Sequence, residues 1–386
     1  MAGRSKNKIE VTHVGSIPRP PKLTDLLLAQ ERGEPVDETE FWRAAQDATR
    51  AVVQRQLECG ITIGNDGEQP RVGFQTYIPL RMEGFGGANV RGFPTDFEKF
   101  PQMAEQVFAQ MGNSKITAAP QAVADVKYDD MGPIEKECAS FKQALNTVDV
   151  GFDECFMNVP SPGIVATTMG NAYYDTHEAY VMTVAKEIAK EYRYVADQGF
   201  TLQVDAPELA MERAWMFKDE PISKFKEVTE LHIAAINAAI GDIPREQVRL
   251  HACWGNWNGP HVDDVDLKNV VKIFYDANVC GLNLPFGNPR HEHEIAVLKS
   301  IPLPDHMDLY PGVIDSTTNY MEHPEVVARR LSDAIEAVGD KERVVASADC
   351  GFSTFAGYKF CAEDSMWVKL KALADGAKIV TDRYWS

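Results

Sequence analysis

The sequence lacks long apolar stretches, and this absence argues against a membrane protein. No run of residues approaches the roughly 18 uninterrupted apolar positions that a membrane-spanning helix requires. The N-terminal sequence MAGRSKNKIEV is polar and has no apolar segment of the kind found in signal peptides. We therefore expect a cytoplasmic protein that has no membrane partner.

Cysteine and basic residues are also sparse. The chain of 386 residues has seven cysteines, an odd number with wide and irregular spacing, which argues against a disulfide scaffold. Its 39 Lys and Arg residues are outnumbered by 57 Asp and Glu residues, so the net charge is −18. A molecule of this charge is repelled by nucleic acids and by anionic membranes. We expect small molecules, and no nucleic acid, as partners.

No low-complexity linker divides the chain, and no Gly-rich phosphate-binding turn follows its first expected strand. Apolar residues instead recur at helical spacing in segments that alternate with short β-branched runs. Helices are expected at residues 41–58, 178–198, 222–240, 263–277 and 324–338. Strands are expected in ITIGN, FTLQVD, QVRLHA, VCGLNL, DLYPGVI and RVVASA, and near residues 115–120 and 159–169. This alternation predicts a parallel α/β protein.

Polar side chains cluster where these strands end, in the loops DGEQPR, VDAPE, HACWGN, GNPRHEHE, GVIDSTTN and SADCGF. A doubly wound open sheet concentrates its chemistry in one crevice, whereas a closed barrel brings the C-terminal ends of all its strands to one face. Polar loops spread along the whole chain favour the barrel. We therefore expect residues 1–386 to form a single (β/α)8 TIM barrel with an N-terminal extension of about 40 residues.

The run HACWGNWNGPH at 251–261 contains residue types that bind metals. His251 and Cys253 are two positions apart, so on a strand their side chains point to the same face. Cys350, in SADCGF, follows the last expected strand and would reach the same mouth of a barrel. One His and two Cys ligands suit zinc, and catalytic zinc commonly has three protein ligands and an open position. The alternative is a packed cysteine beside a hydrogen-bonded histidine.

Six motifs together resemble the cobalamin-independent methionine synthase superfamily. They are VTHVGSIPRP at 11–20, NDGEQPR at 65–71, LQVDAPEL at 202–209, HACWGNWNGPH at 251–261, GNPRHEHE at 287–294 and SADCGF at 347–352. The resemblance spans nearly the whole chain in order. It is to the catalytic C-terminal barrel of that family and to single-barrel relatives such as epoxyalkane:coenzyme M transferase. It implies a barrel of the methionine synthase/uroporphyrinogen decarboxylase-like type.

The resemblance assigns a chemistry to the metal-binding residue types. His251, Cys253 and Cys350 match the positions that bind Zn2+ in the family, where the metal lowers the pKa of an acceptor thiol. The zinc-bound thiolate then attacks a methyl group or, in the coenzyme M enzyme, an epoxide carbon. The resemblance therefore implies a small-molecule thiol and a methyl or alkyl donor as substrates, with Zn2+ as the cofactor.

Five other positions are candidates for substrate contact or catalysis. Asp205 matches a family carboxylate that binds the substrate amino group, and Glu68 matches an acid near the same site. Ser16 matches a loop that holds the substrate carboxylate. His13 either orients substrate or anchors the N-terminal loop. For Asp315, a substrate or proton-transfer role and a loop hydrogen bond or helix cap are equally open.

The remaining candidates have structural alternatives. Trp254 is a candidate substrate-binding residue, although it and Trp257 would also serve as packing that shields the metal. Residues 290–294 would make a second metal cluster, but a hydrogen-bonded, ion-paired helix start is the favoured interpretation. We expect His261 to be a loop residue, and the tyrosine pair at 173–174 to lie over the mouth of the barrel.

Two departures from the family pattern bear on function. Relatives with a similar NPRH motif carry a glutamate three residues before its Asn as the remaining zinc ligand, but Pro285 stands there in this chain. Either three residues hold the zinc, or Asn283 or Glu292 substitutes, or the site is weakened. The chain also has the length of one barrel, without the additional barrel that helps methionine synthase bind polyglutamylated folate. The identity of the donor therefore stays open.

Three functions are consistent with these observations. The leading hypothesis is a zinc-dependent thiol-activating methyl or alkyl transferase. A lyase or a thiol–epoxide transferase would use the same thiolate on another electrophile. The third, from another class, is a non-catalytic barrel that binds metal or a small ligand. A homo-oligomer is compatible with each, and no stretch of sequence identifies its interface.

Overall fold

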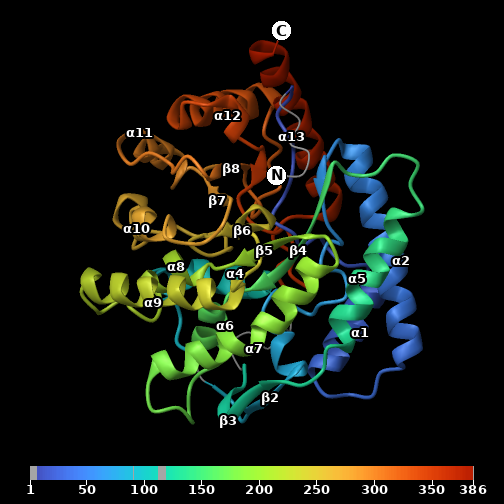
Figure 1. Cartoon of the computed structure of the whole chain (residues 1–386), viewed down its shortest axis with the longest axis vertical. Helices are drawn as coiled ribbons and strands as arrows, with labels where there is room; N and C mark the ends of the chain where they lie inside the picture. Colours follow the sequence, from blue (N-terminus) through green and yellow to red (C-terminus); the bar gives the residue numbers. More distant parts are fainter. Residues whose placement is uncertain (1–6, 90, 112–118, 386) are drawn as a thin grey trace.

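The computed structural model describes residues 7–89, 91–111 and 119–385. Within them, a parallel sheet of seven strands has the order β1-β4-β5-β6-β7-β8-β9, and helices cover its outer side (Figure 1). The strands are β1 (Ile63–Gly64), β4 (Glu154–Pro160), β5 (Thr201–Asp205), β6 (Val248–His251), β7 (Gly281–Pro285), β8 (Asp308–Ile314) and β9 (Ser347–Ala348). Since all seven run in the same direction, their C-terminal ends share one face, where the polar loops gather.

The first part of the described chain lies between the two edge strands of this sheet. Val11 forms a parallel bridge with Ala346, which precedes β9, and Ile63 N of β1 donates to Val11 O at 3.0 Å. Ala346 N also donates to Glu10 O at 2.9 Å. The segment around Val11 therefore contacts both edges of the sheet. The predicted parallel α/β architecture is confirmed as a curled sheet of seven strands within the described residues.

Capping residues explain where several helices begin and end. The side chain of Asp37 accepts a hydrogen bond from Glu40 N and begins α2, which ends at Gly60 with φ 90°. The predicted helices are confirmed, with α10 shorter than expected. The helices are α1 (Pro21–Glu31), α2 (Glu38–Cys59), α3 (Thr95–Lys99), α4 (Pro101–Gln110), α5 (Gly132–Leu145), α6 (Pro162–Thr168), α7 (His177–Asp197), α8 (Glu208–Met211), α9 (Ile222–Ile240), α10 (Leu267–Phe274), α11 (Val297–Ser300), α12 (Pro324–Val338) and α13 (Glu363–Tyr384). Among the described helices, none combines the length and the apolar character needed to cross a membrane.

One predicted strand needs correction, and another falls mostly outside the described residues. The strand expected at residues 159–169 is wrong, because β4 ends at Pro160 and helix α6 follows. Ser161 accepts a hydrogen bond from Ile164 N at 2.9 Å, and Pro162 occupies the first turn, which together begin a helix. The strand expected near residues 115–120 falls mostly outside the described residues. After it, β3 (Gln121–Tyr128) pairs antiparallel with β2 (Met82–Gly86) in a separate ribbon.

A buried charged network supports the loop that follows β1. Arg71 donates to Glu137 Oε2 at 2.8 Å and to Asn158 O at 2.6 Å. Arg81 pairs with the same Glu137 carboxylate, and all of these side chains are buried. A buried charge that loses its partner is strongly destabilising, so these pairs hold the loop against α5 and β4.

Candidate active site

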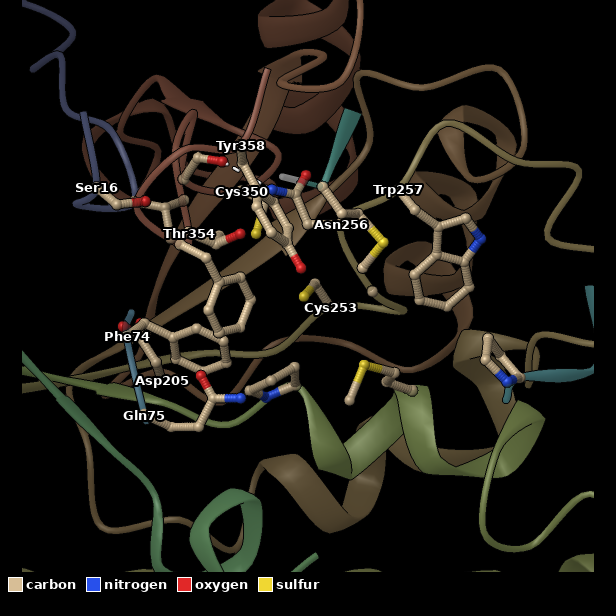
Figure 2. Close-up of a pocket in the computed structure, with 18 of the residues that line it drawn as sticks. Ser16, Phe74, Gln75, Asp205, Cys253, Asn256, Trp257, Cys350, Thr354 and Tyr358 are labelled. Carbon is tan, nitrogen blue, oxygen red and sulfur yellow. Dashed lines mark hydrogen bonds between the residues drawn. The ribbon is translucent and has the colours of Figure 1, made fainter. Parts of the chain in front are cut away.

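The three predicted metal ligands meet at the C-terminal ends of β6 and β9. His251 is the last residue of β6, Cys253 follows it closely, and Cys350 follows β9. All three residues are buried, and their potential ligand atoms lie within 4.8 Å of one another. Figure 2 shows both cysteine sulfurs at the centre of a pocket, with Trp257 on one side and Phe74 on the other. The curled sheet thus brings together residues that are almost 100 positions apart in the sequence.

His251 presents one nitrogen to this cluster. Its Nδ1 donates to Asn283 Oδ1 at 2.9 Å, while the amide nitrogen of Asn283 donates to Ser347 Oγ at 2.6 Å. The other ring nitrogen, Nε2, is buried and has no hydrogen-bond partner among the described residues. A buried nitrogen lone pair beside two cysteine sulfurs matches the ligand set of catalytic zinc sites, so these residues fit the metal.

The two cysteine thiols differ in acidity. A hydrogen bond from Cys350 lowers the pKa of Cys253 well below the usual range, although burial opposes this shift. The same hydrogen bond, together with burial, raises the pKa of Cys350 well above its usual range. These opposite directions favour ionisation of Cys253 over ionisation of Cys350. Thiolates are the form in which cysteine binds metals.

Pro285, which stands where relatives carry a glutamate ligand, lies near this cluster. Pro285 ends β7 and borders a second pocket together with Cys253 and Cys350. Neither of the substitute ligands considered from the sequence joins the clustered metal-binding atoms. The carboxylate of Glu292 pairs instead with the guanidinium groups of Arg329 and Arg330. Asn283 contacts the histidine, so its position is that of an orienting residue.

Two carboxyl groups, Asp205 and Glu68, line the same pocket as the cysteines. Asp205, at the end of β5, accepts hydrogen bonds from Asn158 Nδ2 and Gln203 Nε2, each at 2.8 Å. Glu68 has φ 53°, which is strained for a non-glycine residue. Burial, and then the neighbouring Asp205, raise the pKa of Glu68 to about 8. Burial also raises the pKa of Asp205. A cation bound between these two carboxyl groups would favour their ionised forms.

The segment that carries Ser16 closes over these acids. Gly15 has φ 142°, and a Cβ atom there would lie 2.6 Å from Glu68 Oε1, so only glycine fits this position. Ser16 is buried and lines the pocket (Figure 2). His13 contacts Gln56 Oε1 at 2.8 Å and accepts a hydrogen bond from Gly15 N at 3.1 Å. Burial lowers the pKa of His13 to about 4, so this residue anchors the segment as a neutral imidazole.

Two pockets open onto the cysteine pair. The first, which we call the aromatic pocket, is lined by Ser16, Glu68, Asp205, His251, Cys253, Cys350, Asn256, Gln75 and a set of aromatic side chains. The second, the polar pocket, is bordered by Cys253, Cys350, Trp254, Pro285, Asn288, Arg290, His291, Asp315, Thr317 and Asp349. Asp315 Oδ1 accepts hydrogen bonds from the backbone N and the hydroxyl of Thr317, each at 2.9 Å. Asp315 therefore fixes its loop and also borders the polar pocket.

The two tryptophans of the motif HACWGNWNGPH have different positions. Trp254 stacks on the ring of His291 with centroids 4.1 Å apart, and its Nε1 donates to Val265 O at 2.7 Å. Its buried ring thus packs between loops and reaches only the polar pocket. Trp257 lines the aromatic pocket. Of the two, only Trp257 lines the pocket that holds Glu68 and Asp205.

The second histidine cluster is an ion-paired network. His261 Nδ1 and His291 Nε2 both contact Asp264 Oδ2, at 2.9 and 2.8 Å. His291 Nδ1 also contacts Glu294 Oε2 at 2.9 Å. Because both nitrogens of His291 face carboxylates, its pKa is raised despite burial. These contacts agree with the interpretation of residues 290–294 as a hydrogen-bonded, ion-paired helix start. His261 joins the same network from its loop.

Sequence reasoning did not identify most of the aromatic wall. Phe93, Phe97 and Phe108 come from the region of α3 and α4, which is rich in phenylalanine but has no motif. The high number of phenylalanines in this region was the only signal in the sequence that could have indicated an aromatic wall. The tyrosine pair at 173–174 borders neither pocket; Tyr174 accepts a hydrogen bond from Val126 N of β3 instead.

Comparisons with known proteins agree with this arrangement. No family model matches the chain. The methionine synthase of Thermococcus kodakarensis is 24% identical over 370 residues, which cover 95% of this chain and 92% of that protein. The 2-hydroxypropyl-CoM lyase of Xanthobacter autotrophicus is 27% identical over 246 residues, 56% of this chain and 60% of the relative. A B12-independent methionine synthase from Shewanella, solved with selenomethionine, has a TM-score of 0.73 at 20% identity and shares the fold over 97% of this chain and 98% of its own.

The similarities to the two methionine synthases extend over nearly the whole chain. Both curated names are names of enzymes, so the prediction of an enzyme is confirmed. The resemblance inferred from the six motifs is confirmed as well, since the relatives found include proteins named methionine synthase and 2-hydroxypropyl-CoM lyase.

Proposed function

We propose that the chain is a zinc-dependent, thiol-activating methyl or alkyl transferase. The observation that carries this proposal is the cluster of His251, Cys253 and Cys350 at the base of a pocket that also holds two carboxyl groups. A methionine synthase and a CoM lyase among the relatives support a thiol as the acceptor.

His251, Cys253 and Cys350 are the residues that would hold the zinc. When bound, zinc lowers the pKa of a substrate thiol, so that a thiolate is present at neutral pH. Asn283 keeps the histidine ring in the required orientation through the 2.9 Å contact with Nδ1. His251, Cys253 and Cys350 are all buried, and exclusion of water from the site would favour the sulfur as a nucleophile.

Asp205 and Glu68 would bind the amino group of an amino-acid thiol, and Ser16 would contact its carboxylate. Asn158 and Gln203 support this by holding Asp205 through two hydrogen bonds of 2.8 Å. Glu68 Oε2 is buried without a hydrogen-bond partner among the described residues, so it is available to accept the thiol proton. A carboxyl group whose pKa is raised to about 8 is suited to proton transfer near neutral pH. Asp315 borders the other side of the cysteines and is the candidate donor of a proton to the leaving group.

A thiol–epoxide transferase or lyase is the second candidate. Pro285 beside the cysteines and the similarity to a CoM lyase favour it. The substitution Asp205→Asn separates the two candidates, since homocysteine has an amino group and coenzyme M has none. A rise in KM for homocysteine with coenzyme M turnover unchanged would identify an amino-acid thiol as the acceptor. Turnover of coenzyme M alone would identify the second candidate.

The proposal includes a closed (β/α)8 barrel as a single catalytic domain. The bridge between Val11 and Ala346, and the hydrogen bond from Ile63 N to Val11 O, support an eighth strand at the seam. Such a closed ring places every C-terminal strand end around the one site.

Metal analysis tests this function directly. Anaerobically purified protein should contain near-stoichiometric zinc, and Cys350→Ser should lose it. Cys361→Ser is the matched control, since Cys361 is also buried but lies outside the ligand cluster. Zinc absent from the wild type, or retained equally by Cys350→Ser, would contradict the proposed site.

A further inference from the structure

A wall of aromatic rings stands beside the cysteine pair and takes no part in the proposed binding of zinc or of an amino group. The cavity beside these rings has a volume of about 100 Å³ and opens to solvent through its mouth. The rings that line it are those of Phe74, Phe93, Phe97, Phe108, Trp215, Trp257, Phe355 and Tyr358. Figure 2 shows Phe74, Tyr358 and Trp257 around the two sulfurs.

These rings support one another. The centroid of Phe97 lies 5.2 Å from that of Phe108 and 5.9 Å from that of Trp257, both in edge-on contacts. Edge-to-face contacts of this kind stabilise an aromatic array beyond the effect of burial. Phe97 and Trp257 are buried, whereas Phe93 and Phe108 are 41% and 40% exposed. The side chains of Phe93 and Phe108 therefore form the outer rim of the aromatic pocket.

The aromatic wall of the pocket offers no unpaired Lys or Arg to an anionic ligand. Arg91 is the one Lys or Arg among the described residues that line it, and its guanidinium pairs with Glu212. The same guanidinium lies 3.8 Å from the ring centroid of Trp215. The other ionisable groups that line it include the acids Glu68 and Asp205 and the clustered His251, Cys253 and Cys350. At the aromatic wall, away from this cluster, a ligand carboxylate or phosphate would lose its hydration without gaining an unoccupied Lys or Arg.

We infer that the aromatic pocket binds an uncharged alkyl or aryl group of the electrophile and holds its reacting carbon against the thiol sulfur. This inference rests on the proposed function, in which the polar groups of the thiol occupy the side formed by Ser16, Glu68 and Asp205. The aromatic wall is then left to the second substrate. An extended anionic donor, such as a polyglutamylated one, does not match this wall.

The transfer balances without a further reactant. The thiolate sulfur gives an electron pair to the carbon of the alkyl or aryl-alkyl group and forms the C–S bond. The bond from that carbon to its leaving oxygen breaks, and the oxygen retains the bonding pair. It then takes up one proton, equal to the proton lost when the thiol ionised. An epoxide supplies such an oxygen within the same molecule.

Binding of unreactive probes tests the inference. We choose 2-phenylethanol as an uncharged probe and phenylacetate as a probe with the same ring and a carboxylate, measured by calorimetry and by quenching of tryptophan fluorescence. Phenylacetate should bind at least about tenfold more weakly. Phe93→Ser and Phe108→Ser should each weaken 2-phenylethanol binding about five- to tenfold, because each removes apolar contact at the rim. Phe100→Ser is the matched control, since Phe100 is 38% exposed but does not line the pocket, and binding should not change.

Equal affinity for the two probes would overturn the inference, as would unchanged affinity in both rim variants. Circular dichroism of the rim variants shows whether they fold, and their high exposure favours this. The same titrations in Cys350→Ser separate this inference from the proposed function. Binding of 2-phenylethanol that persists in this variant supports the pocket independently of zinc, whereas its loss together with the metal would overturn an apolar pocket that recognises the ligand by itself.

Discussion

His251 and Asn283 are register partners on the adjacent strands β6 and β7, and their side chains meet at 2.9 Å between Nδ1 and Oδ1. Ser347 of β9 fixes the far side of the Asn283 amide at 2.6 Å. Three strands therefore determine how one imidazole is oriented. The consequence is that Nε2 is left for the cysteine cluster, as a metal ligand requires.

Removing this support should weaken metal binding without removing a ligand. Asn283→Ala should lower zinc affinity about 10- to 100-fold, because the imidazole loses the acceptor that fixes its tautomer. Asn283→Asp keeps an acceptor at the same place and should retain affinity. Competition with a chromogenic chelator measures both variants. Equal zinc affinity in Asn283→Ala and in the wild type would show that the contact has no orienting role.

A substitution of Pro285 tests whether a fourth protein ligand can join the three residues that would hold the zinc. Its place at the end of β7, bordering the polar pocket with both cysteines, means that an acidic side chain there would approach the cluster. Pro285→Glu should therefore tighten zinc binding about tenfold or more. Glu292→Gln should leave zinc affinity unchanged, since Glu292 is occupied by Arg329 and Arg330. Unchanged affinity in Pro285→Glu would place this position outside the coordination sphere.

The buried charged network predicts a large stability effect away from the cysteines. Glu137→Ala should lower the free energy of unfolding by about 3–5 kcal/mol, because Arg71 and Arg81 both lose a buried partner. Differential scanning calorimetry measures the change. Glu336→Ala is a suitable control, since it breaks a salt bridge to Lys299 in which Glu336 is 71% exposed, and the unfolding temperature should barely move. Similar effects of the two substitutions would contradict a structural role for the network.

The buried carboxyl group of Glu208 should make the free energy of unfolding depend on pH. Burial raises the pKa of Glu208 from 4.5 to about 8, although its carboxylate accepts a hydrogen bond from Ser161 at 2.6 Å. Between these pH values the folded protein retains a proton that the unfolded chain releases, so this residue lowers the free energy of unfolding as pH rises from about 5 to 8. Glu208→Gln removes that contribution. The gain in unfolding temperature of Glu208→Gln over the wild type should grow across this range, and a gain independent of pH would contradict the assignment.

Local signals in the sequence were sufficient for much of the architecture. The helix at 324–338 matches α12, where the Gly339 stop sits at φ 80°. His251 and Cys253 could be placed on one face because the period of a strand is two residues. The addition of Cys350 needed only the expectation that strand ends converge. The strand expected at 159–169 failed because the apolar run after Ser161 is a buried helix, which periodicity does not distinguish from a buried strand.

Features that depend on tertiary contact could not be predicted in the same way. Nothing local to Asn283 indicates that it would support His251, since their contact depends on strand register. The pairing of Arg71 with Glu137 joins residues 66 positions apart. The aromatic wall is assembled from five separate regions of the chain, and of its members only Trp257 lies in one of the six motifs. Each of these follows from how the strands and loops pack, which composition and spacing do not specify.

Zinc-edge X-ray absorption in the presence of candidate thiols is the most direct measurement of the central claim. Homocysteine, coenzyme M and glutathione would be added in turn to the zinc-loaded wild-type protein. We expect one of them to add a sulfur to the shell formed by His251, Cys253 and Cys350, and the others to leave it unchanged. A coordination shell that no thiol alters would contradict thiol activation at this site.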